Sequence, residues 1–166
     1  PGGGRARGPV AVGRAWGEVL LRPERFFRTA VAPGDQAPGL AFAMAVVLVE
    51  EASRLALAPA SVPPLVGSVP LSALLVVAVA VLVVTPVGLH LVAAVATLGL
   101  LAVADGRRGV GETVQVVAYA SAPCALAGVP SPALRIAATA YGTYLLVVGL
   151  AVVHGVEGCR VDYDVR

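Results

Sequence analysis

Charge is scarce in this sequence of 166 residues, and one kind of charge is missing. Only 13% of the residues are charged, all 12 basic residues are arginine, and no lysine occurs. Soluble domains contain about a quarter charged residues. Together with 58% hydrophobic residues and a mean hydropathy of +0.87, this composition excludes an ordinary soluble domain and predicts an integral membrane protein. The net charge of +2 does not point to a particular kind of partner, and we do not expect the protein to bind nucleic acid.

Cysteine and histidine are also rare, with two of each. Cys124 lies in an apolar run and Cys159 in a polar tail, without CxxC spacing or a histidine cluster, so neither a disulfide framework nor a zinc site is predicted. Ser121 and Cys124 have no base in their own segment, and only another helix could bring His90 to them. No HExxH motif or phosphate-binding loop occurs. We therefore predict a protein that is not an enzyme and binds no cofactor or metal.

Long runs of apolar residues are the main feature of the sequence. Because about 20 helical residues cross the hydrocarbon core at roughly 1.5 Å per residue, these runs predict an all-α, polytopic transmembrane bundle of about four spans. The transmembrane domain covers 39–153, between a basic arm at 1–38 and a polar tail at 154–166. The expected spans are about 39–58, 70–104, 111–129 and 133–153.

The second run allows two topologies, because residues 69–104 contain no formal charge and are long enough for a tight hairpin or one long helix. Cytoplasmic loops collect arginine. A single span places Arg107 and Arg108 on the same side as the arginine-rich arm, whereas a hairpin places them on the opposite side. We favour one long, tilted helix kinked at Pro86. The protein is then a multi-pass protein of the cell membrane with a cytoplasmic N-terminus.

The third and fourth spans are joined by a very short turn, which predicts a tight antiparallel pair. In the fourth span, Ala138 and Gly142 have the small-xxx-small spacing that permits close helix contact.

In the arm, apolar residues recur among arginines at nearly helical spacing, namely Trp16, Val19, Leu20, Phe26 and Phe27. This pattern predicts a helix in the lipid headgroup region, divided at Pro23. Trp16, Phe26 and Phe27 are accordingly candidates for contact with lipid or a partner. A loop whose two phenylalanines cap the bundle remains an open alternative.

Four polar residues lie within the predicted spans at depths of roughly 15 to 20 Å from the inner face, namely Glu50, His90, Cys124 and Tyr144. Ionisable groups at such depth are hypotheses for function, so a proton or solute relay is one interpretation. The candidate belt consists of Glu50, Arg54, His90, Tyr119, Cys124 and Tyr144.

The structural alternative assigns these side chains to packing. Glu50 and Arg54 have the i,i+4 spacing of a helical ion pair. His90 would then donate to a backbone carbonyl freed at the Pro86 kink, and the tyrosines would be spacers between helices.

Short motifs along residues 13–155 resemble those of the Yip-one family of small polytopic membrane proteins, in particular its prokaryotic, haloarchaeal members. The motifs are Arg22-Pro23-Glu24-Arg25-Phe26-Phe27, Leu89-His90, Glu112-Thr113 followed by Val-Val-Ala-Tyr119-Ala-Ser-Ala-Pro123, and Tyr141-Gly-Thr-Tyr144.

This resemblance implies an all-helical membrane domain without an established enzymatic activity. Eukaryotic relatives act in vesicle transport and bind Rab-type GTPases, whereas the prokaryotic members have no comparable assigned role. The family usually has a fifth span where this chain has its polar tail, which truncation or a shifted reading frame would explain. We expect a membrane scaffold whose partners are the bilayer and other proteins or copies of itself. The alternative is a small permease or proton-coupled transporter that uses the polar belt.

Overall fold

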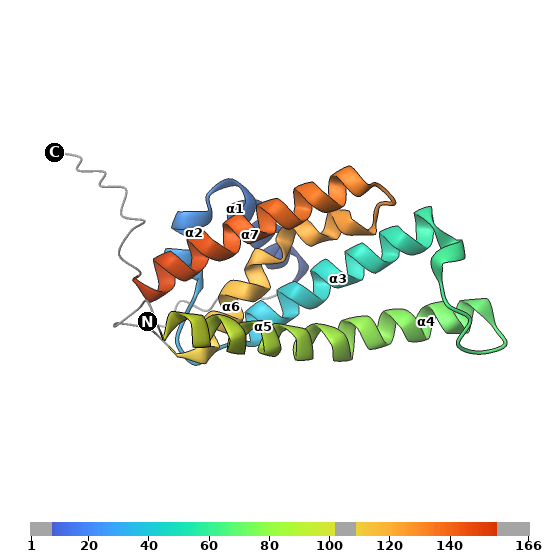
Figure 1. Cartoon of the computed structure of the whole chain (residues 1–166), viewed down its shortest axis with the longest axis horizontal. Coiled ribbons are helices and arrows are strands. Elements are labelled where there is room, and N and C mark those ends of the chain that lie inside the picture. The colour runs from blue at the N-terminus through green and yellow to red at the C-terminus, as the bar shows by residue number, and fades with distance from the viewer. Residues whose placement is uncertain (1–7, 102–108, 156–166) are drawn as a thin grey trace.

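The computed structural model describes residues 8–101 and 109–155, and all regular elements in these ranges are helical (Figure 1). Most of the helices have proline in their first turn, where its missing N–H and fixed φ suit a helix start. The elements are α1 (Pro9–Leu21), α2 (Pro23–Ala30), α3 (Ala37–Leu57), η1 (Pro59–Ser61), α4 (Val69–Val79), η2 (Ala80–Val84), α5 (Thr85–Leu100), α6 (Val110–Ala120), η3 (Ala122–Gly128) and α7 (Pro132–His154).

The run that allowed two topologies is one helix. Elements α4, η2 and α5 form a continuous 32-residue helix, Val69–Leu100, and the hairpin alternative is therefore wrong. The element η2 is a π-helical turn directly before Thr85 and Pro86. Proline removes a backbone donor and crowds the preceding turn, which a wider turn relieves. The Thr85 hydroxyl donates to the carbonyl of Ala80 at 2.8 Å, which satisfies a backbone acceptor in this turn.

At the centre of the bundle lies α6, in which every residue from Glu112 to Ala120 is buried. It packs against α3, α5 and α7. After Ser121 the chain continues as the 3-10 helix η3, whose first turn contains Pro123. The predicted third span is thus helical throughout, but its second half is wound more tightly than an α-helix.

Small residues bring the helices close to α6 and η3. A Cβ atom at Gly128 would lie 2.0 Å from the carbonyl oxygen of Glu50, and one at Gly142 would lie 3.3 Å from the carbonyl oxygen of Ala120. Ala138 of α7 is buried as well. The close helix contact predicted from Ala138 and Gly142 is confirmed at Gly142.

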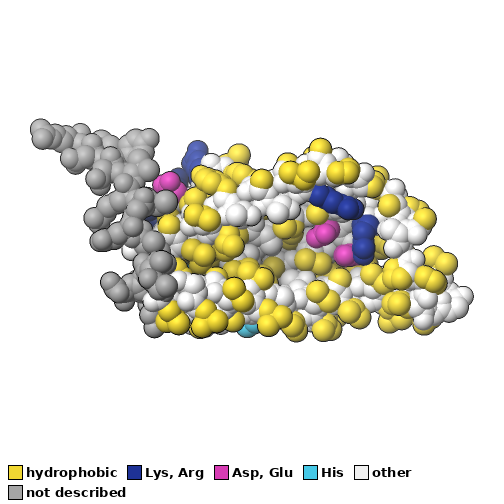
Figure 2. Space-filling view, viewed as in Figure 1, with side chains coloured by type: hydrophobic (Ala, Val, Ile, Leu, Met, Phe, Trp, Pro, Cys, Tyr) yellow, Lys and Arg dark blue, Asp and Glu magenta, His cyan; other side chains and the backbone are white. Residues whose placement is uncertain are grey.

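Two helices in the described ranges are long and apolar enough to cross a membrane: Val69–Leu100 and Pro132–His154. In their most apolar windows only 17% and 22% of the residues are buried inside the protein, so neither helix is the core of a soluble domain. Hydrophobic side chains cover much of the visible face (Figure 2). A soluble protein rarely exposes such an area, whereas a bilayer covers it.

Candidate functional site

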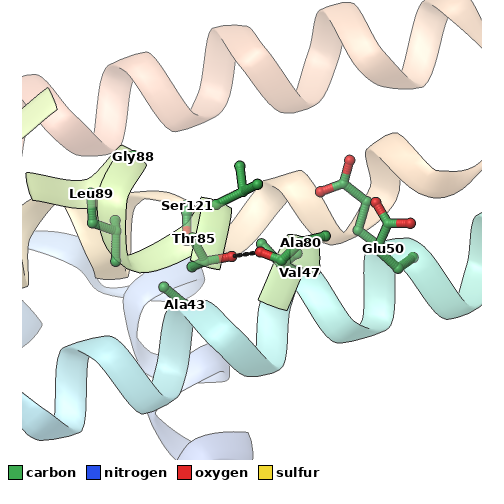
Figure 3. Close-up of a pocket in the computed structure, with 10 residues that line it drawn as sticks. Ala43, Val47, Glu50, Ala80, Thr85, Gly88, Leu89 and Ser121 are labelled. Atoms are coloured by element: carbon green, nitrogen blue, oxygen red, sulfur yellow. Dashed lines mark hydrogen bonds between the residues drawn. The ribbon is translucent and has the colours of Figure 1, made fainter. Parts of the chain in front are cut away.

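A groove of about 340 Å³ opens between α3 and the long helix (Figure 3). Apolar residues of both helices form its walls, Ser121 lies in it from the end of α6, and Glu50 lies toward one end. The lining residues are Ala43, Val47, Glu50, Glu51, Ala80, Val84, Thr85, Gly88, Leu89 and Ser121.

The hydroxyl groups of this groove already have backbone partners. Thr85 donates to Ala80, and Ser121 donates to the carbonyl of Ala118 at 2.7 Å. The half-buried carboxylate of Glu50, in contrast, makes no hydrogen bond or ion pair with any residue that the structure describes. Glu50 is therefore the group in the groove that is available to a ligand or a proton.

Arg54 pairs with Glu51, so the predicted pairing of Arg54 with Glu50 is wrong. Glu51 is buried, and a carboxylate shielded from water attracts a neighbouring guanidinium more strongly than an exposed one. The i,i+3 spacing of the observed pair is as compatible with a helix as the predicted i,i+4 spacing. Arg135 of α7 is also within electrostatic range of Glu50. Figure 2 shows acidic and basic side chains gathered in this part of an otherwise largely apolar face.

The other residues of the predicted belt do not line the groove. Cys124, which is half-buried, is near enough to Glu50 to interact with it electrostatically. Tyr119 is buried among aromatic rings, whereas His90 and Tyr144 are exposed on the outside of the bundle. Their common depth thus does not produce one common site, because depth along a helix does not fix the direction in which a side chain points.

His90 makes the type of contact that the structural alternative predicts. Its Nδ1 lies 2.7 Å from a backbone carbonyl oxygen, that of Pro86 one turn earlier in the same helix. This is the carbonyl of Pro86 itself. It is not the carbonyl one turn earlier, which loses its N–H donor because of the proline.

The arm is part of the bundle. Phe26 and Phe27 are only 4% and 1% exposed, and the Phe26 ring packs edge-on against Tyr119 with centroids 4.8 Å apart. The prediction that they contact lipid or a partner is wrong, because α2 buries its apolar face against α7. They cap the bundle, as the alternative predicted, but from a helix and not from a loop.

Trp16 joins the same aromatic cluster. Its ring lies 5.4 Å from that of Phe42, and its Nε1 donates to the carbonyl of Ala122 at 3.1 Å. Trp16 is half-buried, so its polar atom serves the attachment of α1 to η3.

Gln115, which the sequence analysis did not single out, fastens the arm to α6. Its fully buried amide accepts from the backbone N–H of Ala32 at 3.2 Å and donates to the carbonyl of Ala32 at 2.7 Å. Tyr141 adds a hydrogen bond from its hydroxyl to the carbonyl of Leu20 at 2.5 Å. An amide in an otherwise apolar span is the signal that could have identified Gln115, since such a group needs partners.

Helices with extensive apolar outer faces, two of them long and apolar enough to cross a membrane, are typical of a helical membrane protein. No group of three potential metal ligands occurs within residues 8–101 and 109–155. The family model of the Yip1 domain matches residues 17–160, and the chain belongs to this family. No curated protein and no solved structure matches the chain. The family assignment thus agrees with the resemblance, while the haloarchaeal branch stays a prediction.

Proposed function

We propose that this protein is a non-enzymatic scaffold that crosses the cell membrane four times and binds its partners within the bilayer. The four crossings are α3, the long helix, α6 with η3, and α7. The observation that carries this proposal is the long helix, whose outer face is apolar and exposed along its whole length.

The arrangement of helix ends supports this topology. The first residues of α3 and α6 and the last residues of α5 and α7 lie toward the same end of the bundle (Figure 1). The arm, with Arg22, Arg25 and Arg28 in or beside α2, is attached to the bundle and precedes α3. The loop at the opposite end of α3, residues 58–68, contains no arginine. This asymmetry supports a cytoplasmic location of the arm.

The buried arm changes which surface a partner meets. Because Phe26 and Phe27 are core residues, a partner cannot bind them without unfolding α2. The long helix instead offers side chains that no part of the described chain covers, including Leu82, Leu91 and Val95.

A photo-crosslinking amino acid introduced into the full chain in native membranes tests this proposal. Placed at Leu82, Leu91 or Val95, it should yield discrete protein adducts. At buried Ala93 of the same helix it should yield none with other chains. Only lipid adducts at all three exposed positions would contradict the scaffold function.

The groove favours a second candidate, a small permease, because Glu50 is an ionisable group without an ion-pair partner among the described residues. Liposomes containing the purified protein test this function. Glu50→Gln should abolish a proton-coupled flux, and Leu48→Ala on the exposed side of the same helix should leave it intact. A flux that Glu50→Gln does not change would exclude the permease mechanism.

A further inference from the structure

His90 presents a hydrogen-bond acceptor on the outside of the long helix. Its Nδ1 lies 2.7 Å from the carbonyl oxygen of Pro86, and a carbonyl only accepts, so Nδ1 carries the proton. A charged ring is disfavoured in hydrocarbon. In the neutral ring Nε2 is then an acceptor, and no described residue donates to it. Lipid chains offer no donor, so this nitrogen favours a partner that brings one.

A shallow, open hollow lies beside His90. Pro86, Val87, His90 and Leu91 line a surface depression of about 380 Å³ that is almost entirely apolar. An apolar hollow with one acceptor suits a flat, apolar group that carries a single hydroxyl. The phenol ring of tyrosine has this combination.

Tyr144 presents such a phenol on α7. It is 49% exposed and stacks on Tyr141 with ring centroids 5.7 Å apart. Its hydroxyl donates to no residue that the structure describes, whereas the hydroxyl of Tyr141 donates to the carbonyl of Leu20.

The donor and the acceptor lie at matching depth. His90 lies ten residues before Leu100, the end of α5, and Tyr144 lies ten residues before His154, the end of α7. Both helices run in the same direction and end on the same side of the bundle (Figure 1). Each side chain is therefore about 15 Å from that end along its helix axis. A second copy that lies in the same bilayer in the same orientation thus brings its tyrosine near the height of this histidine.

We propose that the protein associates with itself by inserting Tyr144 of one copy into the Pro86–Leu91 hollow of the next, where the phenol donates to Nε2 of His90. Because this names a second copy as one partner of the scaffold, it rests on the proposed function. Figure 1 places the long helix and α7 along opposite edges of the bundle, with α3 and α6 between them. The contact joins two different surfaces of the protein. Repeated contacts of this kind produce a closed ring when the rotations from each copy to the next add up to a full turn.

Disulfide cross-linking in liposomes tests the geometry. In a full chain carrying Cys124→Ala and Cys159→Ala, Val87→Cys marks the hollow, and Ala140→Cys marks α7 one turn before Tyr144, at nearly the same distance from the helix end as Val87. Both positions are exposed. Differently tagged copies should cross-link when mixed, whereas neither variant should cross-link alone. Dimers from either variant alone would indicate a two-fold contact and overturn the proposal, as would no cross-link in the mixture.

Substitutions test the hydrogen bond. Tyr144→Phe and His90→Phe should each weaken association by roughly 3-fold to 15-fold, the range expected for one hydrogen bond between membrane helices. The double variant should be no weaker than the single ones. Thr143→Val, next to Tyr144 and also exposed, is the matched control and should change nothing. Additive losses, or no loss, would overturn the proposal. Photo-adducts with other proteins that persist without self-association would show that this contact fails while the scaffold function stands.

Discussion

The two sides of the bundle are built differently. On one side, the arm, α6 and α7 form a dense core in which Val19, Phe27, Val116 and Leu145 are almost completely buried. On the other side, the long helix buries only a narrow stripe and exposes large apolar side chains over the rest of its surface. The first side holds the protein together, and the second is available to lipid and to other chains. Substitutions should therefore affect stability on one side and association on the other.

The largest expected effect is that of Phe27→Ala on the dense side. Phe27 is 1% exposed and contacts the arm, α6 and α7, so its truncation leaves a cavity. We expect a loss of about 3 to 5 kcal/mol in the free energy of unfolding. Denaturant titration in detergent micelles measures it. Leu98→Ala on the exposed face of α5 is the control, and an equal loss there would contradict the difference between the two sides.

A comparison of two glycines sharpens the contrast. In Gly128→Ala the new Cβ would lie 2.0 Å from the carbonyl oxygen of Glu50, and a backbone atom cannot move aside easily. We expect a destabilisation of about 1 to 3 kcal/mol. Gly99→Ala in α5 meets nothing within 4 Å and should leave stability unchanged or raise it slightly. Thermal unfolding of the two variants in the same detergent measures the difference, and equal melting temperatures would refute it.

Gln115→Leu should release the arm. Without the amide, the backbone groups of Ala32 lose both partners, at a cost of about 1 to 3 kcal/mol. Hydrogen exchange of residues 23–32 should become faster than in the parent protein, while exchange in α5 stays the same. The same substitution at Gln36, outside this contact, is the matched control. If exchange in the arm does not change, other contacts hold it in place.

Thr85→Val should have the smallest effect. The substitution keeps the β-branched shape but removes the hydrogen bond to Ala80 in the π turn. Hydrogen bonds of this type inside membrane proteins contribute about 0.6 kcal/mol on average. A small fall in melting temperature is expected, without a change in self-association. A large loss of association would show that the π turn also shapes the hollow on the exposed side.

Much of the fold was predictable because it follows from local rules. The apolar runs indicated the helical segments, and proline marked where most of them start. Absence of charge between Val69 and Leu100, together with the arginines after it, favoured the single long helix. The π turn before Pro86 was not predicted, since proline shows that a helix is disturbed but not how the strain is relieved.

The candidate site was less predictable. The ion pair predicted for Glu50 is made by Glu51 instead. Phe26 and Phe27, candidates for an external contact from their spacing, are core residues. Residues of the arm and of α6 are about 80 to 100 positions apart, and no spacing rule connects them.

The sequence by itself determined that the chain is helical, belongs in a membrane and has one span too long for a simple crossing. Composition and the spacing of apolar residues suffice for this, because they decide what a segment can bury and which backbone hydrogen bonds it makes. Only the tertiary structure decided which carboxylate Arg54 neutralises, that the arm closes over α6, and that His90 and Tyr144 face outward. These depend on the rotation of each helix about its axis and on contacts between distant segments, which packing of the whole bundle fixes.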